Sequence, residues 1–556
     1  PVIIRYAMPL SGLPALWAAI FPAEPATLPS MLLGIELGPG EYGRVFLFPT
    51  ALLWSVSAWF AVRLMKKGPR IAGFAFFFLL TMAGNLGLII ALDVPTFYTC
   101  FALMTFAAYG LIVHERTSEA MQAGRIYLVM ALAGEAFMIA ALFLAVDAAG
   151  TTALREMAAA VALSPHRDLI ITTVWIGFGV KAGAFLLHFW LPLAHPVAPT
   201  PASAVLSGCM IKAGLLGWLH FLPLGLVALP SWGNAILLFG VLALYFGVIA
   251  GLGEPRPKTI LAYSSISQMG LMTIPLGLGL AYAPGWHLLL PVVLLLVVNH
   301  ALAKGMLFLA AGIASQTGRS MGKWFLPACA LIPSLALAGL PWTGGGAAKS
   351  ALKKNLPPLD LFNIVPVDLL LLLSSTGTMF LLGHFLLHLK DTLPDQRKKC
   401  DFHLWLPWMV ILPFLVLSPE WVGELSGKTL HLDSKGVVEE ILAAWPVLVG
   451  ILLLFPFRKV CRECVLPSPV SWNTINRSMA KLIDRGLAVL DLLRPGDSLP
   501  VRFIARKYVR WFVPEVADPD VLLQLEKRFL HWYSMALVFV LMLSAFLLVM
   551  YLGTIG

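Results

Sequence analysis

Four lysines lie inside apolar stretches of the sequence, where a charged side chain is costly. They are Lys181, Lys212, Lys304 and Lys349. A lysine at the centre of a bilayer costs about 2.5–3.5 kcal/mol on insertion scales, so each is a candidate functional residue. Burial favours the neutral amine, which allows such a lysine to take up and release a proton near neutral pH. The alternative for any one of them is an amine that stretches to the lipid headgroups.

Three histidines accompany these lysines in the sequence. His188 and His195 lie between Lys181 and Lys212, and His300 precedes Lys304 by four residues, which places that pair on one face of a helix. Together with water, lysine and histidine side chains can form a proton relay. Taken singly, each histidine also fits a hydrogen-bonded packing role.

Glu135 is the only glutamate well inside an apolar run of the first half of the chain. We expect it to pair with Lys181, because an opposite charge offsets part of the cost of burying an amine. The alternative is a carboxyl group that is capped by neighbouring backbone or faces a partner subunit.

Helix-breaking residues flank the buried lysines. Four prolines interrupt the stretch between Lys181 and Lys212, and the run Pro341-Trp-Thr-Gly-Gly-Gly346 precedes Lys349. Irregular backbone at membrane depth is tolerated only where it is buried in protein or lines a cavity. Broken helices beside buried charge are how transport proteins build ion sites, whereas the simpler alternative is a re-entrant loop.

The composition sets the fold class that must position these residues. Of the 556 residues, 59% are hydrophobic and only 12% are charged, against about a quarter charged in soluble domains. A single soluble core stops growing at about 250–300 residues, so the surplus apolar surface must face lipid. We therefore predict an all-α polytopic membrane protein with about 14 transmembrane helices of some 20 residues each. The first segment, 7–21, is read as a span or half-span in preference to a signal peptide.

The net charge of +10 is explained by basic cytoplasmic loops and does not indicate nucleic-acid binding. The basic loops 63–70 and 114–125 are both predicted on the cytoplasmic side. Six cysteines are too scattered for a disulfide scaffold, and the pair Cys461 and Cys464 lacks the second pair that a metal site needs. We expect no metal and no cofactor, since nucleotide, haem, flavin and iron–sulfur motifs are missing from the sequence.

The chain divides into five predicted regions. They are N-terminal transmembrane helices (1–90), a first half-channel (91–225), a second half-channel with following helices (226–457), a basic amphipathic interfacial segment (458–531) and a C-terminal span (532–556). The interfacial reading of the fourth region rests on apolar residues at helical spacing. A solvated subdomain is its alternative.

Three stretches resemble the antiporter-like subunits shared by complex I, group 4 membrane hydrogenases and Mrp cation/proton antiporters. They read KAGAFLLHFWLPLAHPVAPTPASAVLSGCMIKAG over 181–214, KTILAYSSISQMG over 258–270 and NHALAKGMLFLAAG over 299–312. The resemblance covers about 90–350 and implies two inverted half-channels with broken helices, joined by a central line of lysine and histidine.

The resemblance also assigns roles to individual positions. It makes Lys181 the central lysine of the first half and Lys212 its link to the middle, with His300 and Lys304 at the centre of the second half and Lys349 on the exit side. One departure stands out: the family has a buried glutamate where this sequence has Ala102.

The function implied is that of a proton-translocating or ion-coupling subunit of a multisubunit respiratory, hydrogenase-like or Mrp-type complex. Its partners would be other membrane subunits, with protons or sodium as the ion and the cell's inner (plasma) membrane as the location. Any redox chemistry would belong to partners, so the chain would be a non-redox subunit of a translocase. The alternatives are the membrane subunit of an inorganic-carbon uptake system and a degenerate scaffold subunit without transport.

Overall fold

A computed structural model describes the greater part of the first 463 residues. The described residues are 7–21, 24–29, 34–65, 71–317, 319–355, 360–361, 365–393, 402–427 and 443–463. They belong to one compact unit that ends at Val465. The predicted span 532–556 lies outside the described residues, as does the predicted interfacial segment 458–531 apart from 458–463, which continue a helix.

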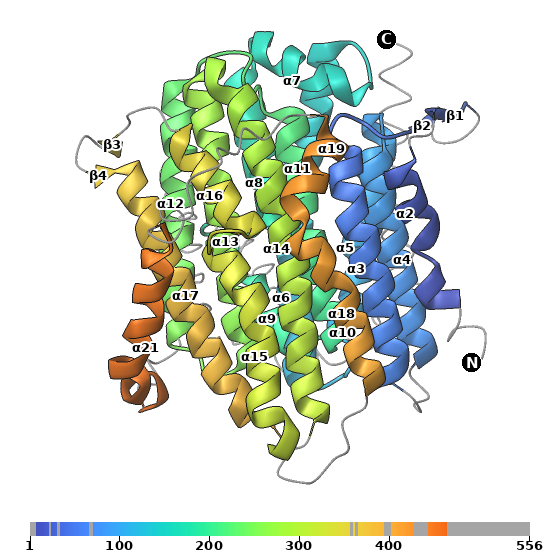
Figure 1. The fold of residues 1–556 in the computed structure, drawn as a ribbon. Coiled ribbons are helices and arrows are strands. Elements are labelled where there is room, and N and C mark those ends of the chain that lie inside the picture. Colours follow the sequence, from blue (N-terminus) through green and yellow to red (C-terminus); the bar gives the residue numbers. More distant parts are fainter. Residues whose placement is uncertain are drawn as a thin grey trace, which may run out of the picture. The chain divides into compact units, whose positions relative to one another are not determined.

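The described residues are overwhelmingly helical (Figure 1). The helices before the second half are α2 (Leu13–Ile20), α3 (Gly43–Leu64), α4 (Ile71–Ile90), α5 (Val94–Ile112), α6 (Ser118–Ala149), α7 (Leu154–Leu163), α8 (Arg167–Ala182), α9 (Trp190–Val197), α10 (Thr200–Val205), the π-helix η1 (Leu206–Met210) and α11 (Ile211–Phe221). Those that follow are α12 (Pro230–Leu252), α13 (Pro257–Ala281), the 3₁₀ turn η2 (Ala283–Gly285), α14 (Trp286–Gln316), α15 (Arg319–Ala338), α16 (Gly344–Lys354), α17 (Val367–Asp391), α18 (Phe402–Val416), α19 (Ser418–Ser426) and α21 (Trp445–Glu463).

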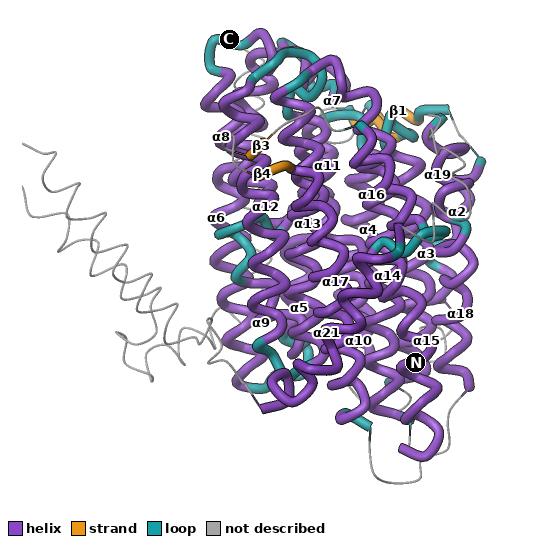
Figure 2. Tube along the Cα trace, turned by 60° about the vertical axis from the view of Figure 1, so that its left-hand side comes forward, coloured by secondary structure: helices purple, strands orange, loops and turns teal. Residues whose placement is uncertain are grey.

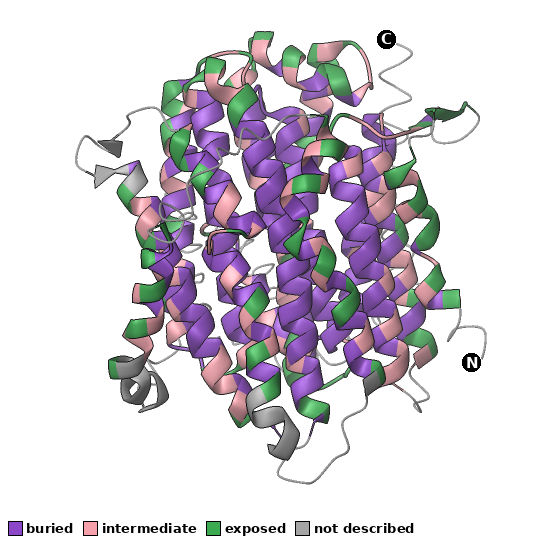
Figure 3. Cartoon of the chain, in the orientation of Figure 1, coloured by how far each residue is buried: buried purple, intermediate pink, exposed green. Residues whose placement is uncertain are grey.

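Eight helices within the described residues are long and apolar enough to cross a membrane, and α18 with α19, bent by 69°, makes up to nine. This count is lower than the predicted number of about 14, partly because three apolar helices of 10–17 residues fall short of a full span. The outer faces expose large apolar side chains such as Trp17, Ile249 and Leu452, while the inner faces are buried (Figure 3). The chain is an all-α multi-pass membrane protein, as predicted.

Two short antiparallel strand pairs accompany the helices and were not predicted. β1 (Ala26–Leu28) pairs with β2 (Ile35–Leu37), and β3 (Asp360–Leu361) pairs with β4 (Val365–Pro366). The β1–β2 pair lies at the end of the helical unit that also carries α7 and α19 (Figures 1 and 2). We call this end of the unit the α7 end. The opposite end, where α15 begins, is called the α15 end.

Helices are broken in both stretches where breaks were predicted, but the first break precedes the prolines that predicted it. Pro192 and Pro196 lie inside α9, and Pro199 lies between α9 and α10. The first break follows α8, where Gly183 adopts φ +70° and Leu186 φ +69° before α9 begins. The second follows α15, where Gly339 adopts φ +88° and Trp342 φ +63° before α16 begins. Left-handed backbone ends an α-helix and frees its last carbonyl groups for other donors.

A third irregularity, the π-helix Leu206–Met210, precedes Lys212 by two residues. π-Helical turns are rare and are frequently found at functional sites. Next to it, Gly214 allows α11 to approach α8 closely, because a Cβ there would lie 2.4 Å from the Phe178 carbonyl oxygen. The fold therefore places Lys212 beside the helix that carries Lys181.

Candidate functional site

Lys181 lies near the C-terminal end of α8 and is buried. Its amine donates hydrogen bonds to Thr105 Oγ1 on α5 and to the Tyr127 hydroxyl on α6, both at 3.1 Å. The Tyr127 hydroxyl in turn donates to the Thr105 carbonyl oxygen at 2.7 Å. The rings of Phe101 and Tyr127 lie 5.8 and 5.5 Å from the amine, within cation–π range. The amine thus has neutral hydrogen-bonding partners and aromatic faces around it.

Glu135 lines the same small cavity as Lys181 and is also buried. Lys181 is its charged electrostatic neighbour, and the hydroxyls of Tyr98 and Thr105 lie beside the carboxylate. Neither carboxylate oxygen makes a hydrogen bond of good geometry within the described residues. The volume open to the centres of water molecules is about 10 Å³, close to the room that one water needs. The predicted partners are therefore neighbours without a direct hydrogen bond, and one water can fit between the walls.

Ala102, which stands where the family has a glutamate, is buried on α5 but is not among the residues that line this cavity. The cavity is lined from α5 by Phe101 and Thr105 instead. The carboxylate beside Lys181 therefore comes from α6, the next helix along the chain.

Lys212 and His300 lie at the centre of the described unit. The Lys212 amine donates to the Ser207 carbonyl oxygen at 2.7 Å and hydrogen-bonds His300 Nδ1. The Ser207 carbonyl belongs to the π-helix, so this local irregularity supplies an acceptor to the lysine. His300 Nε2 is buried without a partner within the described residues, which leaves that nitrogen available to water.

Lys304 follows His300 by one turn of α14, as predicted, and is fully buried. Its amine donates to the Leu261 carbonyl oxygen at 2.9 Å. The Ser265 hydroxyl bonds the same carbonyl at 2.9 Å and lies 2.8 Å from Ser207 Oγ. Polar groups of α13 and the π-helix therefore connect the surroundings of Lys304 with those of Lys212.

Lys349 lies on α16, beyond the second helix break. Its amine donates to the Ala338 carbonyl oxygen at 3.0 Å and to Ser375 Oγ on α17 at 3.1 Å. The Ala338 carbonyl is the last of α15 and is freed by the break. Hydrogen bonds between described residues do not join Lys181 or Lys349 to the central group around Lys212, so the four lysines form three separate clusters.

The two remaining predicted histidines have different surroundings. His195 is fully buried, packs against Phe308 with ring centroids 4.9 Å apart, and has Lys304 and Lys212 among its electrostatic neighbours. His188 lies among aromatic rings, including Phe246 at 4.9 Å. Both nitrogens of each ring lack a hydrogen-bond partner within the described residues. His195 therefore belongs with the central lysines, whereas His188 lies in an aromatic setting.

Several polar residues that position the lysines were not predicted as site residues. Tyr127, Thr105 and Ser375 bond the amines directly, and Lys258 donates to the Ala198 carbonyl oxygen between α9 and α10 at 2.8 Å. Lys258 lies near the start of a largely apolar segment, a signal that could have marked it. The hydroxyl residues have no comparable mark, because single hydroxyls are common in transmembrane helices.

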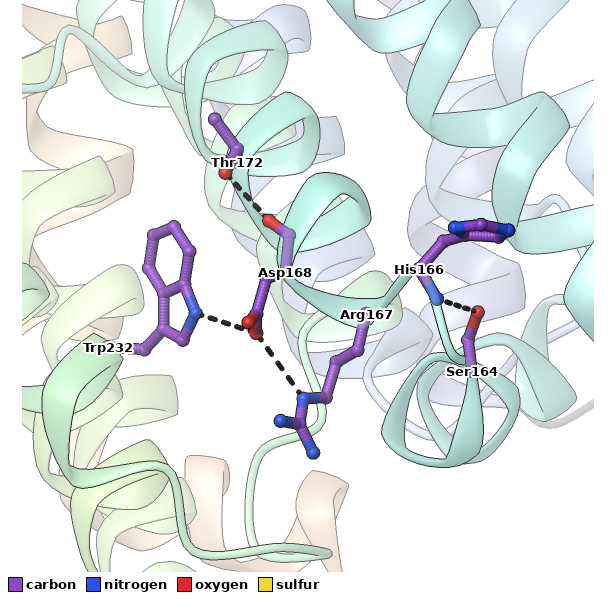
Figure 4. A network of polar contacts seen from close by, with 6 residues as sticks. All are labelled: Ser164, His166, Arg167, Asp168, Thr172 and Trp232. Carbon is purple, nitrogen blue, oxygen red and sulfur yellow. Dashed lines mark hydrogen bonds and ion pairs between the residues drawn. The ribbon is translucent and has the colours of Figure 1, made fainter.

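A surface network at the start of α8 fixes this lysine-bearing helix to α12 (Figure 4). The Asp168 carboxylate accepts a hydrogen bond from Trp232 Nε1 at 3.0 Å and pairs with Arg167 Nε at 3.5 Å. Groups of three or more metal-ligating side chains are not found among the described residues. The side chains of Cys461 and Cys464 lie outside what the structure describes.

Residues 91–364 match the family described as NADH:quinone oxidoreductase/Mrp antiporter, transmembrane domain. The chain belongs to this superfamily of antiporter-like membrane subunits. All four buried lysines lie inside the matched residues, and the resemblance seen in the sequence is confirmed.

Among antiporter-like relatives, "Hydrogenase-4 component B" of Escherichia coli K12 is 29% identical over 354 residues, covering 59% of this chain and 52% of the relative. "NADH-quinone oxidoreductase subunit M" of Pseudomonas aeruginosa PAO1 is 26% identical over 418 residues, covering 68% of this chain and 78% of the relative. The chain spans about half the length of several curated relatives that it matches.

Two solved structures share the fold. A chain in the Mrp complex from Dietzia sp. DQ12-45-1b aligns with a TM-score of 0.73 and 21% identity, over 92% of this chain and 60% of that chain. A chain of the archaeal membrane-bound sulfane sulfur reductase aligns with a TM-score of 0.61 and 22% identity, over 80% of this chain and 93% of that chain. The architecture is therefore that of the antiporter-like subunits.

Proposed function

We propose that this chain is an ion-coupling subunit of a multisubunit membrane complex, and that protons move along its buried lysines and histidines. One observation carries the proposal. Each of the four buried amines donates only to neutral groups, which are carbonyl oxygens, hydroxyls or an imidazole. At Lys212, Lys304 and Lys349, loss of the proton leaves no buried opposite charge without a partner, so these amines can exist in both protonation states. At Lys181, the neighbouring Glu135 carboxylate can take up the proton instead.

In this proposal, Glu135 and Lys181 form the loading pair of the first half. The carboxylate favours the charged amine while a proton is held, and a water in their shared cavity carries the proton between them. Thr105 and Tyr127 hold the amine in place, so they are positioning residues. The separation of this cluster from Lys212 means that onward transfer requires water or a movement of α8 or α11.

The central group then passes the proton across the middle of the protein. Lys212 exchanges with His300 through their hydrogen bond, and the serine hydroxyls and His195 offer further stations toward Lys304. Lys349, beyond the second helix break, is the proposed last station. The order of stations follows the roles that the family resemblance assigns.

The energy for transport is proposed to come from partner subunits. The relatives carry the names of hydrogenase and NADH-quinone oxidoreductase components, while this chain carries no redox motif that we identify. The ion is proposed to be the proton, with sodium as the alternative, and the location the plasma membrane.

The test compares two lysines on the same helix. Lys349→Met removes the buried amine, whereas Lys353→Met, one turn further along α16, removes an exposed one. With the full complex in proteoliposomes, we expect Lys349→Met to reduce proton pumping per turnover at least tenfold, a change of about 1.4 kcal/mol in the barrier. Lys353→Met is expected to pump like wild type.

Equal pumping by both variants would contradict the proposal and favour a scaffold subunit. Loss of bicarbonate uptake in place of pumping would favour the inorganic-carbon alternative. Assembly of the complex, measured by co-purification of its subunits, separates loss of transport from loss of folding.

A further inference from the structure

Four phenylalanines pack together between Lys181 and the α7 end. Phe97 and Phe101 come from α5, Phe178 from α8 and Phe221 from α11, and all four are buried. Their ring centroids lie 5.6–6.3 Å apart in five pairs, within the range of favourable aromatic contact. We call this set the phenylalanine cluster. It offers no hydrogen-bonding group to water.

Ionisable groups lie on both sides of the phenylalanine cluster. On its inner side, the Lys181 amine is 5.8 Å from the Phe101 ring. On its outer side, the His220 ring is 5.8 Å from Phe97 and 5.5 Å from Tyr42. The cluster therefore lies between an amine of the proposed transport path and an imidazole nearer the α7 end.

The outer side continues to the protein surface. Glu41 is exposed, acts electrostatically on His220 and lies beside the Tyr42 hydroxyl. Burial, together with the Glu41 carboxylate, raises the pKa of Tyr42, so this phenol stays protonated and can donate a hydrogen bond. Glu41, Tyr42 and His220 thus lead from the surface to the edge of the cluster.

The spacing along α5 gives the depth of the cluster. Thr105, Phe101, Phe97 and Asp93 recur every four residues, so they follow one face of the helix. Thr105 bonds Lys181, and Asp93 caps the helix at its start by accepting from the Thr96 amide. The distance along the axis from Thr105 to Phe97 is about 12 Å. Two successive turns of α5 therefore present aromatic rings between Lys181 and the α7 end.

We propose that Glu41, Tyr42 and His220 form a second proton port at the α7 end, and that the phenylalanine cluster is the dry barrier that closes it from Lys181. This inference rests on the proposed proton-conducting function. Apolar constrictions in membrane channels gate by excluding water, and a proton cannot cross a stretch that lacks both water and ionisable groups. The closed barrier keeps a proton on Lys181 from returning directly to the α7 end. Rotation of the Phe97 and Phe101 rings would let water join Lys181 to His220.

The simpler alternative is that the four rings are ordinary core packing. Truncating any buried phenylalanine lowers stability, so stability alone does not separate the two cases. Passive proton conductance separates the two cases. Removing rings increases proton leak only if those rings form the barrier between two ionisable groups.

The experiment measures this leak with the full complex in proteoliposomes that enclose a pH-sensitive dye. A potassium diffusion potential drives protons inward without any substrate. We expect the double variant Phe97→Ala/Phe101→Ala to raise passive proton flux at least about tenfold. The control is Phe78→Ala, a fully buried phenylalanine on α4 that packs against Trp54 and Phe74 and lies outside the cluster. Its flux is expected to equal that of wild type.

Adding His220→Phe to the double variant is expected to return the flux to the wild-type level, because the port then lacks its imidazole. A double variant that co-purifies with its partners and stays as tight as wild type would overturn the barrier. A leak that His220→Phe leaves unchanged would overturn the port. The leak is passive, so it can appear even if Lys349→Met has no effect on pumping. The leak assay therefore tests the barrier and the port, and the pumping assay tests the proposed function separately.

Discussion

Glu135 is the residue on which the proposed loading step depends. It is buried beside Lys181, and its carboxylate lacks a hydrogen bond within the described residues. A carboxylate in such a place is a candidate functional group, because no local hydrogen bond offsets the free-energy cost of burying it. It comes from α6, whereas Ala102 on α5 does not line the cavity.

We expect Glu135→Gln to abolish coupled proton transport while the complex still assembles, because the amide keeps the shape but cannot carry the proton. The matched control is Glu119→Gln, which changes an exposed glutamate in the first turn of the same helix. Proton pumping per turnover in proteoliposomes checks both. Full pumping by Glu135→Gln would remove Glu135 from the transport path and leave it a structural group.

The residue scale also shows what the sequence could not reveal. Lys181, Lys212, Lys304 and Lys349 could be named because lysine inside an apolar run is rare and costly. Their hydrogen-bond partners could not be named from the sequence. Thr105 and Tyr127 reach Lys181 from other helices, at sequence separations of 76 and 54 residues. Such contacts depend on how helices pack, which hydropathy along one helix does not encode.

At the scale of elements, the helices and their breaks followed from hydropathy and from proline and glycine, whereas the π-helix did not. The break before α16 coincides with a run of proline and glycine, residues that end helices, whereas the break before α9 contains Gly183 alone and precedes the prolines. Leu206–Met210 has one glycine and no proline, so an ordinary α-helix was the natural expectation. The phenylalanine cluster was equally hidden, since phenylalanine in a span usually faces lipid or core.

The close packing of α11 on α8 gives a prediction for Gly214. A Cβ at Gly214 would lie 2.4 Å from the Phe178 carbonyl oxygen and 2.5 Å from the Ala182 amide nitrogen, so backbone must move. We expect Gly214→Ala to lower stability by about 1–3 kcal/mol, as overpacking does, which appears as a lower Tm in detergent.

The control for this prediction is Gly73→Ala on α4, where an added Cβ meets nothing within 4 Å. Its Tm is expected to match or exceed that of wild type, because alanine favours helix more than glycine does. An unchanged Tm in Gly214→Ala would mean that α8 and α11 can separate without cost, and the two lysine clusters would then be less firmly placed.

At the scale of the whole molecule, the alternation of helix directions assigns loops to the two ends. Leu163, at the end of α7, is highly exposed at the α7 end, and Glu119, at the start of α6, is exposed at the opposite end. The basic stretch 114–125, which includes Glu119 and the start of α6, is predicted to be cytoplasmic. The α7 end should therefore face away from the cytoplasm.

Labelling of intact cells with a membrane-impermeant maleimide checks this orientation. In a chain whose six native cysteines are replaced, Leu163→Cys is expected to react from outside and Glu119→Cys only after the membrane is permeabilised. The reverse pattern would invert the orientation, and the proposed port at Glu41 would then open to the cytoplasm. Labelling of both sites from outside would contradict the alternation of spans itself.

The π-helix has a further consequence, for the angular phase of α11. A π-turn amounts to one residue more than an α-helix needs over the same length, and each residue of an α-helix corresponds to about 100° of rotation. Relaxing Leu206–Met210 to a regular α-helix with the same number of residues would turn the Lys212 side chain by about that angle, away from His300. The regular helix would be better hydrogen-bonded, but its lysine would be misaligned. This segment therefore sets the direction in which the central lysine points.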